Sequence, residues 1–380
     1  MNESGGPSRV PRMLSPLDEY PIHQTPLSMA AVATSDRNFY DRCYFNGHDR
    51  TGDVFFITGM GIYPNVGVVD GYLAVKQGER VSTLRFSDAL GDERLCVGPY
   101  RIEVIEPLQK VRVICEPNEH GIAADITWDG SYPALEEQPH VIRKGPKVIL
   151  QSTRFAQVGT WTGTLSIDGV ERTLTPDTWL GSRDRSWGIR PLAPSDPANR
   201  FDEGAEPSFW WLYVPLRFDD FSIIVIMQEG PDGYRTLNDA TRVWPDGRIE
   251  QLGWPRVDFR YRSGSRIPLG CTMHCTTQTG DALDVEVESL GYVPLHLGPG
   301  YGDADWSHGD WRGHNWSQRF EVDLTDPAVA PRIPFGNIDH VARATCREPK
   351  GEAEGFGLFE HATVGRHDPT GFADVMAVAP

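Results

Sequence analysis

The sequence has no apolar run long enough for a membrane-spanning helix, which needs roughly 20 residues. Its longest apolar stretch, 221–227, has the length of one buried strand. The first residues also lack the apolar segment of a secretory signal peptide. We therefore expect a protein without a transmembrane segment, located in the cytoplasm.

Cysteine is scarce and scattered, and no CxxC pair or dense cysteine framework occurs. His274 lies beside Cys275 and three residues after Cys271, which allows a metal interpretation. Residues an even number apart in a strand simply share one face, however, and we favour that interpretation. We predict that all the cysteines are free thiols: Cys43, Cys96, Cys115, Cys271, Cys275 and Cys346.

Basic residues are outnumbered by acidic ones. The chain has 36 Lys and Arg against 53 Asp and Glu, which gives a formal net charge of −17. Binding to phosphate groups needs a basic surface, so we expect no nucleic-acid partner.

Standard catalytic motifs are absent as well. The sequence has no GxSxG, no phosphate-binding GxxxxGKS/T, no complete GxGxxG and no HExxH. Common hydrolase, kinase and nicotinamide chemistries are therefore unsupported, and we expect no cofactor. The Gly-rich stretch 296–316 has histidines and aspartates that a metal site could use, but we favour a loop at the wall of a pocket and expect no metal. These residues are His296, His308, His314, Asp303, Asp305 and Asp310.

Glycine, proline and aromatic residues are abundant, and they favour short strands joined by turns over helices. Apolar and polar residues alternate in 161–167, as in a half-buried strand. Asx-Gly steps, a strong hairpin signal, lie between β-rich stretches. We predict an all-β fold of antiparallel strands with few short helices. The steps are Asn46-Gly47, Asp70-Gly71, Asp129-Gly130, Asp168-Gly169, Asp232-Gly233 and Asp246-Gly247.

A faint internal repeat predicts two β-domains in tandem. The hairpin pattern in 108–128 resembles that in 268–287, about half a chain away. Proline-rich, polar sequence separates the halves, as expected of a connection. We predict a disordered N-terminus at 1–15, domains at 16–192 and 208–380, and a linker at 193–207.

The segment 177–190 combines a carboxylate, arginines and tryptophans. Asp184 is the candidate acid, Trp187 a candidate cavity wall, and Arg190 a candidate substrate contact. An acid in an apolar cavity can protonate an alkene, and aromatic faces stabilise the resulting cation. The alternative is that Asp184 pairs with Arg183, Arg185 or Arg190 and pins a strand end. Further aromatic candidates follow in the chain: Trp210, Trp211 and Tyr213.

A second candidate site lies in the Gly-flanked block 355–367. Glu360 is a candidate catalytic carboxylate and His361 a candidate substrate contact, although Glu360 could equally be a buried hydrogen-bond partner. Near the N-terminus, Tyr63 is a further candidate for substrate binding, with a turn or edge role as the alternative.

Three elements together resemble the carotenoid 1,2-hydratase (hydroxyneurosporene synthase) superfamily, which includes tocopherol cyclase and fungal Diels-Alderases. They are the Asp-x-Ser-Trp-Gly core at 184–188, the hairpin that begins at 159–163, and the block 355–365. The resemblance implies two tandem lipocalin-like (calycin-type) β-barrels or sandwiches with a ligand cavity at or near their junction. It also implies cofactor-free chemistry on hydrophobic, isoprenoid-like substrates, with Asp184 as the motif carboxylate.

We expect a cofactor-independent hydratase or lyase that protonates an alkene of a terpenoid or prenylated molecule and adds water. Two alternatives stay open. The same cavity could run a cyclisation or pericyclic reaction, which needs shape and hydrogen-bond donors. It could also carry an apolar ligand without catalysis, because a fold does not settle a reaction.

Overall fold

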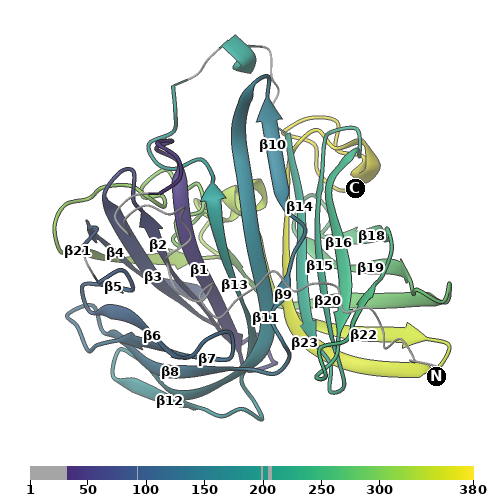
Figure 1. Cartoon of the computed structure of the whole chain (residues 1–380), viewed down its shortest axis with the longest axis horizontal. Coiled ribbons are helices and arrows are strands. Elements are labelled where there is room, and N and C mark those ends of the chain that lie inside the picture. Colours follow the sequence, from purple (N-terminus) through teal and green to yellow (C-terminus); the bar gives the residue numbers. More distant parts are fainter. Residues whose placement is uncertain (1–31, 92, 198–199, 204–207) are drawn as a thin grey trace, which may run out of the picture.

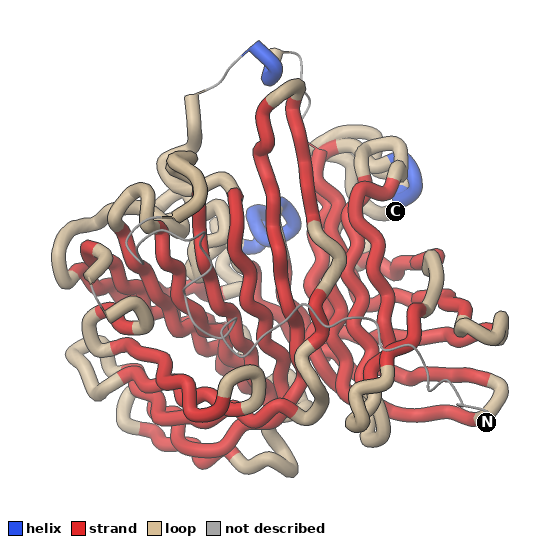
Figure 2. Tube along the Cα trace, viewed as in Figure 1, coloured by secondary structure: helices blue, strands red, loops and turns tan. Residues whose placement is uncertain are grey.

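The computed structural model describes residues 32–91, 93–197, 200–203 and 208–380. The regular structure in these residues is almost entirely antiparallel β-strand, which confirms the predicted all-β class (Figure 2). No helix in this part of the chain is long and apolar enough to cross a membrane. The predicted disordered segment 1–15 lies outside the described residues. The helices are η2 (Arg200–Asp202), η3 (Ala330–Phe335) and η4 (Asp368–Thr370).

The first sheet is built from the N-terminal half of the chain and one later strand. Its order is β21-β4-β3-β2-β1-β13-β11-β8-β7-β6-β5, and it curls until β5 contacts β3 and β4 (Figure 1). The short strands β9, β10 and β12 pair with the long β11. The strands are β1 (Phe39–His48), β2 (Val54–Tyr63), β3 (Val68–Gln77), β4 (Arg80–Ala89), β5 (Cys96–Val97), β6 (Tyr100–Glu106), β7 (Lys110–Cys115), β8 (Ile122–Gly130), β9 (Leu135–Glu136), β10 (His140–Lys144), β11 (Lys147–Ile167), β12 (Val170–Leu174), β13 (Leu180–Ile189) and β21 (Trp316–Asp323).

The second sheet is built from the C-terminal half, in the order β17-β16-β15-β14-β23-β22-β20-β19-β18. Its strand β15 is rich in β-branched residues and is buried on both faces, as expected of a strand packed between two cores. The strands are β14 (Ser208–Arg217), β15 (Ser222–Glu229), β16 (Arg235–Val243), β17 (Ile249–Gln251), β18 (Arg256–Tyr261), β19 (Pro268–Thr276), β20 (Ala282–Pro294), β22 (Ile338–Glu348) and β23 (Gly351–Gly365).

The Asx-Gly steps divide into turns and strand interiors. Asn46-Gly47 and Asp70-Gly71 lie inside β1 and β3, so the hairpins predicted there are wrong. The glycine at Gly47 serves packing instead, because a Cβ would lie 2.3 Å from the ring of Phe56. Asp129-Gly130 ends β8. Turns between strands form at Asp168-Gly169, Asp232-Gly233 and Asp246-Gly247.

The faces of the two sheets form three large apolar cores among the described residues, besides a small cluster around Tyr40 and Tyr63. One fills the interior of the first sheet and one the interior of the second. The third, which we call the interface core, lies between the sheets. Successive side chains of a strand point to opposite faces of its sheet. On β1, Phe45 therefore points into the interior of the first sheet and Tyr44 into the interface core. On β14, Trp210 points into the interior of the second sheet and Trp211 into the interface core.

The strand β21 ties the halves together, because it comes from the C-terminal half yet pairs with β4. The loop before it is held by Arg85, whose side chain is fully buried. Arg85 donates from Nη2 to Asp303 (2.8 Å), from Nη1 to Asp305 (2.7 Å) and from Nε to the carbonyl of Gly298 (2.8 Å). Two of the aspartates considered for metal binding therefore bind an arginine.

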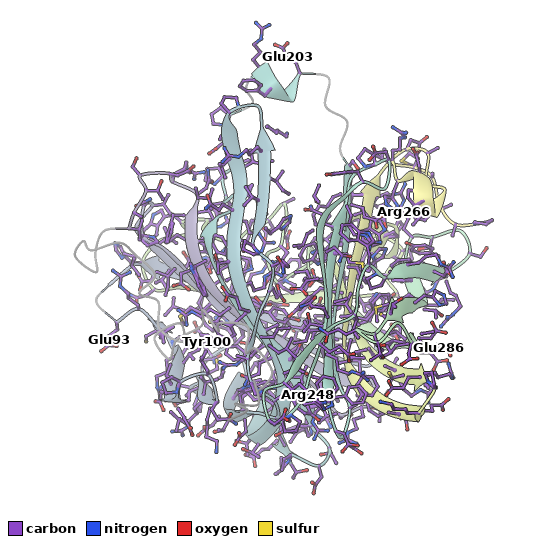
Figure 3. The ribbon with its side chains drawn as sticks, turned by 45° about the vertical axis from the view of Figure 1, so that its right-hand side comes forward. Glu93, Tyr100, Glu203, Arg248, Arg266 and Glu286 are labelled. Carbon is purple, nitrogen blue, oxygen red and sulfur yellow. The ribbon has the colours of Figure 1, made fainter. Side chains whose placement is uncertain are left out.

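The chain end is fixed by a second buried arginine. Arg266 donates to the carbonyls of Ala377 (2.7 Å), Thr363 (3.0 Å) and Gly365 (2.8 Å), and to that of Asp374. Figure 3 labels Arg266 close to the C-terminal helical turn. The tail is thereby anchored on the second sheet.

Candidate active site

A cavity of about 610 Å³ lies between the two sheets, at the edge of the interface core. The first sheet contributes side chains of β1, β11 and β13 to its walls, and the second contributes side chains of β14, β15 and β23. These strands lie side by side, because β13 contacts β23 and β11 contacts β14 (Figure 1). A volume of this size suits a small organic ligand, since ligand pockets measure about 300–1,000 Å³.

A second compartment of about 650 Å³ adjoins this cavity. The two share Arg42, Arg190, Phe209, Tyr301 and other wall residues, so they are neighbouring parts of one recess. The Gly-rich loop predicted as a pocket wall lines the second compartment from 300 to 308.

Asp184 lines the cavity from β13. Burial raises the pKa of its carboxyl, while the nearby guanidinium groups of Arg154, Arg190 and Arg42 oppose that rise. The two arginines next to Asp184 in the sequence point to the opposite face of β13. Arg183 donates to Gln157 (2.8 Å), and Arg185 lies 3.0 Å from Asp41. Asp184 is therefore influenced by the charges of Arg154, Arg190 and Arg42, not by its two neighbours in the chain.

Glu360 lines the same cavity from β23, on the opposite sheet. Burial raises the pKa of its carboxyl to about 7, with the Asp184 charge adding to the rise and Arg154 opposing it. Asn337 donates a hydrogen bond of 2.5 Å to its Oε1. At neutral pH, Glu360 is therefore close to half-protonated and can act as a proton donor.

Asp339 lies beside Glu360 on the same face of the second sheet, because the two residues are directly opposite on β22 and β23. The Asp339 carboxylate is buried and accepts a 2.5 Å hydrogen bond from the Tyr44 hydroxyl. Burial and the nearby Glu360 raise its pKa well above the usual value. A cluster of carboxyl groups with raised pKa values therefore spans the interface of the sheets.

Arg154 lies at the centre of this cluster. Its guanidinium lies over the rings of Trp211 (5.4 Å) and Tyr213 (5.9 Å), and its Nε lies 3.6 Å from Glu137. Burial raises the pKa of Glu137 to about 8. The aromatic wall and the arginine together fix the position of the positive charge that faces the carboxyl groups.

Arg42 is positioned by a short chain of hydrogen bonds through residues of β2 and β3. Its Nε donates to the Tyr63 hydroxyl (3.0 Å), which donates to Asp70 (3.0 Å). Asp70 also accepts the backbone N–H of Gly309 (2.7 Å). Tyr63, predicted as a substrate contact, is therefore fully buried behind Arg42 and orients that arginine.

The apolar wall is formed mainly by Trp211, which stacks on Phe209 and on His140, each with its ring centroid 6.2 Å away. Burial and the charge of Arg154 lower the pKa of His140 to about 4. His140 is therefore neutral at physiological pH and adds to the wall without charge.

Several sequence candidates point away from the cavity. Trp187 is on the opposite face of β13 from Asp184, three residues along. Trp210 and His361 lie inside the second sheet, where His361 hydrogen-bonds the Trp211 carbonyl (2.6 Å) and the Tyr261 hydroxyl (2.9 Å). The sequence argument grouped consecutive residues, whereas consecutive side chains of a strand face opposite sides. The candidates that line the cavity are Asp184, Arg190, Trp211 and Glu360; Tyr213 lies beneath Arg154.

Sequence reasoning missed important residues in and next to the cavity wall. Arg42 and Tyr44 alternate with apolar residues in β1, which was a usable signal for one polar face. Arg154, Asn337 and Asp339 stood in no recognisable pattern. Their role depends on long-range contacts between the sheets.

The described residues contain no group of three or more histidine, cysteine or acidic residues placed to hold a metal ion. The cysteines of this part of the chain are free, including Cys271 and Cys275, which are buried in the second-sheet interior.

Solved structures with this architecture were found at low sequence identity. CghA in complex with Sch210972 has a TM-score of 0.51 at 12% identity, over 86% of this chain and 88% of that one. A protein assigned as AttH from Nitrosomonas europaea has a TM-score of 0.50 at 14% identity, over 85% and 92%. Kievitone hydratase from Nectria haematococca has a TM-score of 0.46 at 14% identity, over 85% and 88%.

The likenesses to CghA and to the Nitrosomonas europaea protein concern the fold alone, and the two curled antiparallel sheets agree with the tandem β-barrel architecture that the sequence resemblance implied. Residues 14–373 match the family of unknown function DUF8625, and the chain belongs to that family. No curated protein matches the sequence.

Proposed function

We propose that the chain is a cofactor-independent hydratase or lyase that protonates an alkene of a hydrophobic small molecule and adds water. One observation carries this proposal: Asp184 and Glu360, from different sheets, line one cavity, and the pKa of Glu360 is about 7. A general acid works best when its pKa lies near the working pH.

The two carboxyl groups take different roles. Protonated Glu360 gives its proton to one alkene carbon, which leaves a cation on the other. Water attacks that cation and loses a proton to Asp184, whose ionised form the surrounding arginines favour. The sum is addition of H and OH across the double bond. This assigns the acid to Glu360 in place of Asp184, the first candidate from sequence.

The apolar wall supports a hydrophobic substrate and a cationic intermediate. Trp211 and Phe209 line the cavity beside the carboxyl groups. An aromatic face stabilises a nearby cation by about 0.5–2 kcal/mol. An isoprenoid-like alkene, which yields a tertiary cation on protonation, fits these surroundings.

A second candidate function is an intramolecular cyclisation in the same cavity. It is favoured by Arg42 and Arg190, whose guanidinium groups line the cavity as hydrogen-bond donors. Such donors polarise a substrate carbonyl and accelerate a ring closure without any proton transfer to carbon.

Heavy-oxygen labelling separates these functions. The protein is purified from its own host, the bound apolar ligand is identified by native mass spectrometry, and the complex is incubated in ¹⁸O water. We expect a product that carries one ¹⁸O atom. A product of unchanged mass with altered chromatographic retention would indicate cyclisation, and an unchanged ligand would indicate a carrier.

The pH dependence of turnover is a further test. The active form has Glu360 protonated, so kcat/KM should fall about tenfold per pH unit above pH 7, because the pKa of Glu360 is about 7. On the acid side, the rate should fall where Asp184 becomes protonated. Steady-state kinetics from pH 5 to 9 measure both limbs, and a rate that keeps rising above pH 8 would contradict Glu360 as the acid.

A further inference from the structure

Arg190, which is half-buried, differs from the buried arginines near the site. Among the described residues, its guanidinium group has no hydrogen-bond or ion-pair partner, and its contact is with the ring of Tyr301, 5.8 Å away. Arg85 and Arg185, by contrast, are paired with carboxylates. Arg190 lines both compartments of the recess, so its donors face space that a ligand can enter.

Arg42 lies beside Arg190 and is partly free in the same way. Its Nε is bound to the Tyr63 hydroxyl, while its two terminal nitrogens have no hydrogen-bond acceptor within the described part of the chain. Arg42 also lines both compartments. Two guanidinium groups therefore present unused donors to the boundary between the compartments.

Carboxyl groups lie near this pair without taking up its free donors. Burial and the positive charge of Arg42 lower the pKa of Arg190, so a neighbouring cation disfavours its charged form. Asp184 faces both arginines, and Asp70, behind Tyr63, favours the charged form of Arg42. Neither carboxylate hydrogen-bonds the terminal nitrogens of Arg42 or Arg190 among the described residues. An anionic group of the ligand would supply the missing acceptors.

We propose that Arg42 and Arg190 form a subsite for a carboxylate, so that the ligand is an apolar molecule carrying one ionised carboxyl group. The proposal rests on the proposed function only in taking this cavity as the substrate site, and it holds equally for a carrier. A carboxylate is favoured because a guanidinium group can offer two parallel N–H donors to its two oxygens.

The rest of the recess suits the apolar body of such a ligand. Phe209 lines both compartments and stacks against Trp211. Leu295 lies in the same wall. A carboxylate held at Arg190 would direct the apolar body along this wall, toward Glu360. The anionic group would thereby position the reacting part of the molecule.

A matched pair of probes tests this subsite. The fluorescent acid 11-(dansylamino)undecanoic acid and its methyl ester share one apolar body and differ only in the charge of the head group. Fluorescence titration at pH 7.5 should show that the wild-type protein binds the acid roughly 10- to 100-fold more tightly than the ester, as expected for charge-assisted hydrogen bonds. Arg190→Met should remove this preference while leaving the affinity for the ester unchanged.

The ester serves as the folding control for the variant, and Arg256→Gln, at an exposed arginine on β18, serves as the matched substitution outside the site. Equal affinity of the wild type for acid and ester would overturn the subsite, as would failure to bind either probe. So would an Arg190→Met variant that weakens both probes equally. Glu360→Gln should keep the preference for the acid, so failure of the catalytic proposal is distinguishable from failure of this one.

Discussion

Replacing Glu360 with Gln should lower the rate of substrate turnover by about 10²- to 10⁴-fold, because a positioned general acid contributes a factor of that size. The amide keeps the shape and can still accept the hydrogen bond from Asn337, but it has no acidic proton to give. Single-turnover kinetics on the ligand identified by mass spectrometry measure this loss directly.

The fold should survive this change. The pKa of Glu360 is about 7 in the folded chain, above the ordinary value of 4.5, so the folded state binds its proton more tightly than the unfolded state. Its contribution to stability is therefore full below pH 4.5 and is lost as the pH rises to about 7. At pH 8, the Gln variant should be at least as stable as the wild type.

Glu354→Gln is the matched control, because Glu354 is an exposed residue of the same strand. It should leave turnover unchanged. A Glu360→Gln variant with wild-type turnover would exclude Glu360 as the acid and return that role to Asp184.

The second large effect concerns stability. Arg85→Met should lower the free energy of unfolding by about 3–5 kcal/mol, because breaking a buried ion pair leaves an uncompensated charge. The side chain of Arg85 is fully buried and that of Asp303 is 3% exposed, so water cannot replace the lost partner. Urea denaturation followed by tryptophan fluorescence measures the change.

Arg80→Met is the matched control for Arg85→Met. Arg80 is also on β4 and pairs with Glu321 of β21, but its side chain is 65% exposed, so its loss should cost about 0–1 kcal/mol. Combining Arg85→Met with Asp303→Asn should cost less than the sum of the single changes, because the second change removes the unpaired charge. Equal losses for the Arg85 and Arg80 variants would contradict this account.

Part of the site was readable from local sequence. Asp184 was found because it stands in a short motif with tryptophan and glycine, and Glu360 because glycines flank its strand. The structure brings both to one cavity. Nothing local indicated that relation, since the residues lie on different sheets and meet only when β13 packs near β23.

The pairing register of each strand determines which of its side chains face the cavity. Trp210 and Trp211 are equally large and aromatic, yet one fills the second-sheet interior and the other lines the cavity. A one-residue shift exchanges the two faces of a strand. The absolute register depends on the partner strand, here the pairing of Trp211 with Ala362 and Gln228.

Local sequence was enough to predict the all-β class, three of the turns between strands and two candidate carboxylates, because glycine, proline, alternation and short motifs act through local conformation. Long-range packing, by contrast, brings β21 into the first sheet and places Arg42, Arg154 and Arg190 around Asp184. It also set the proton affinity of Glu360, because burial and the charges of distant residues fix a pKa, and both arise only when the sheets pack together.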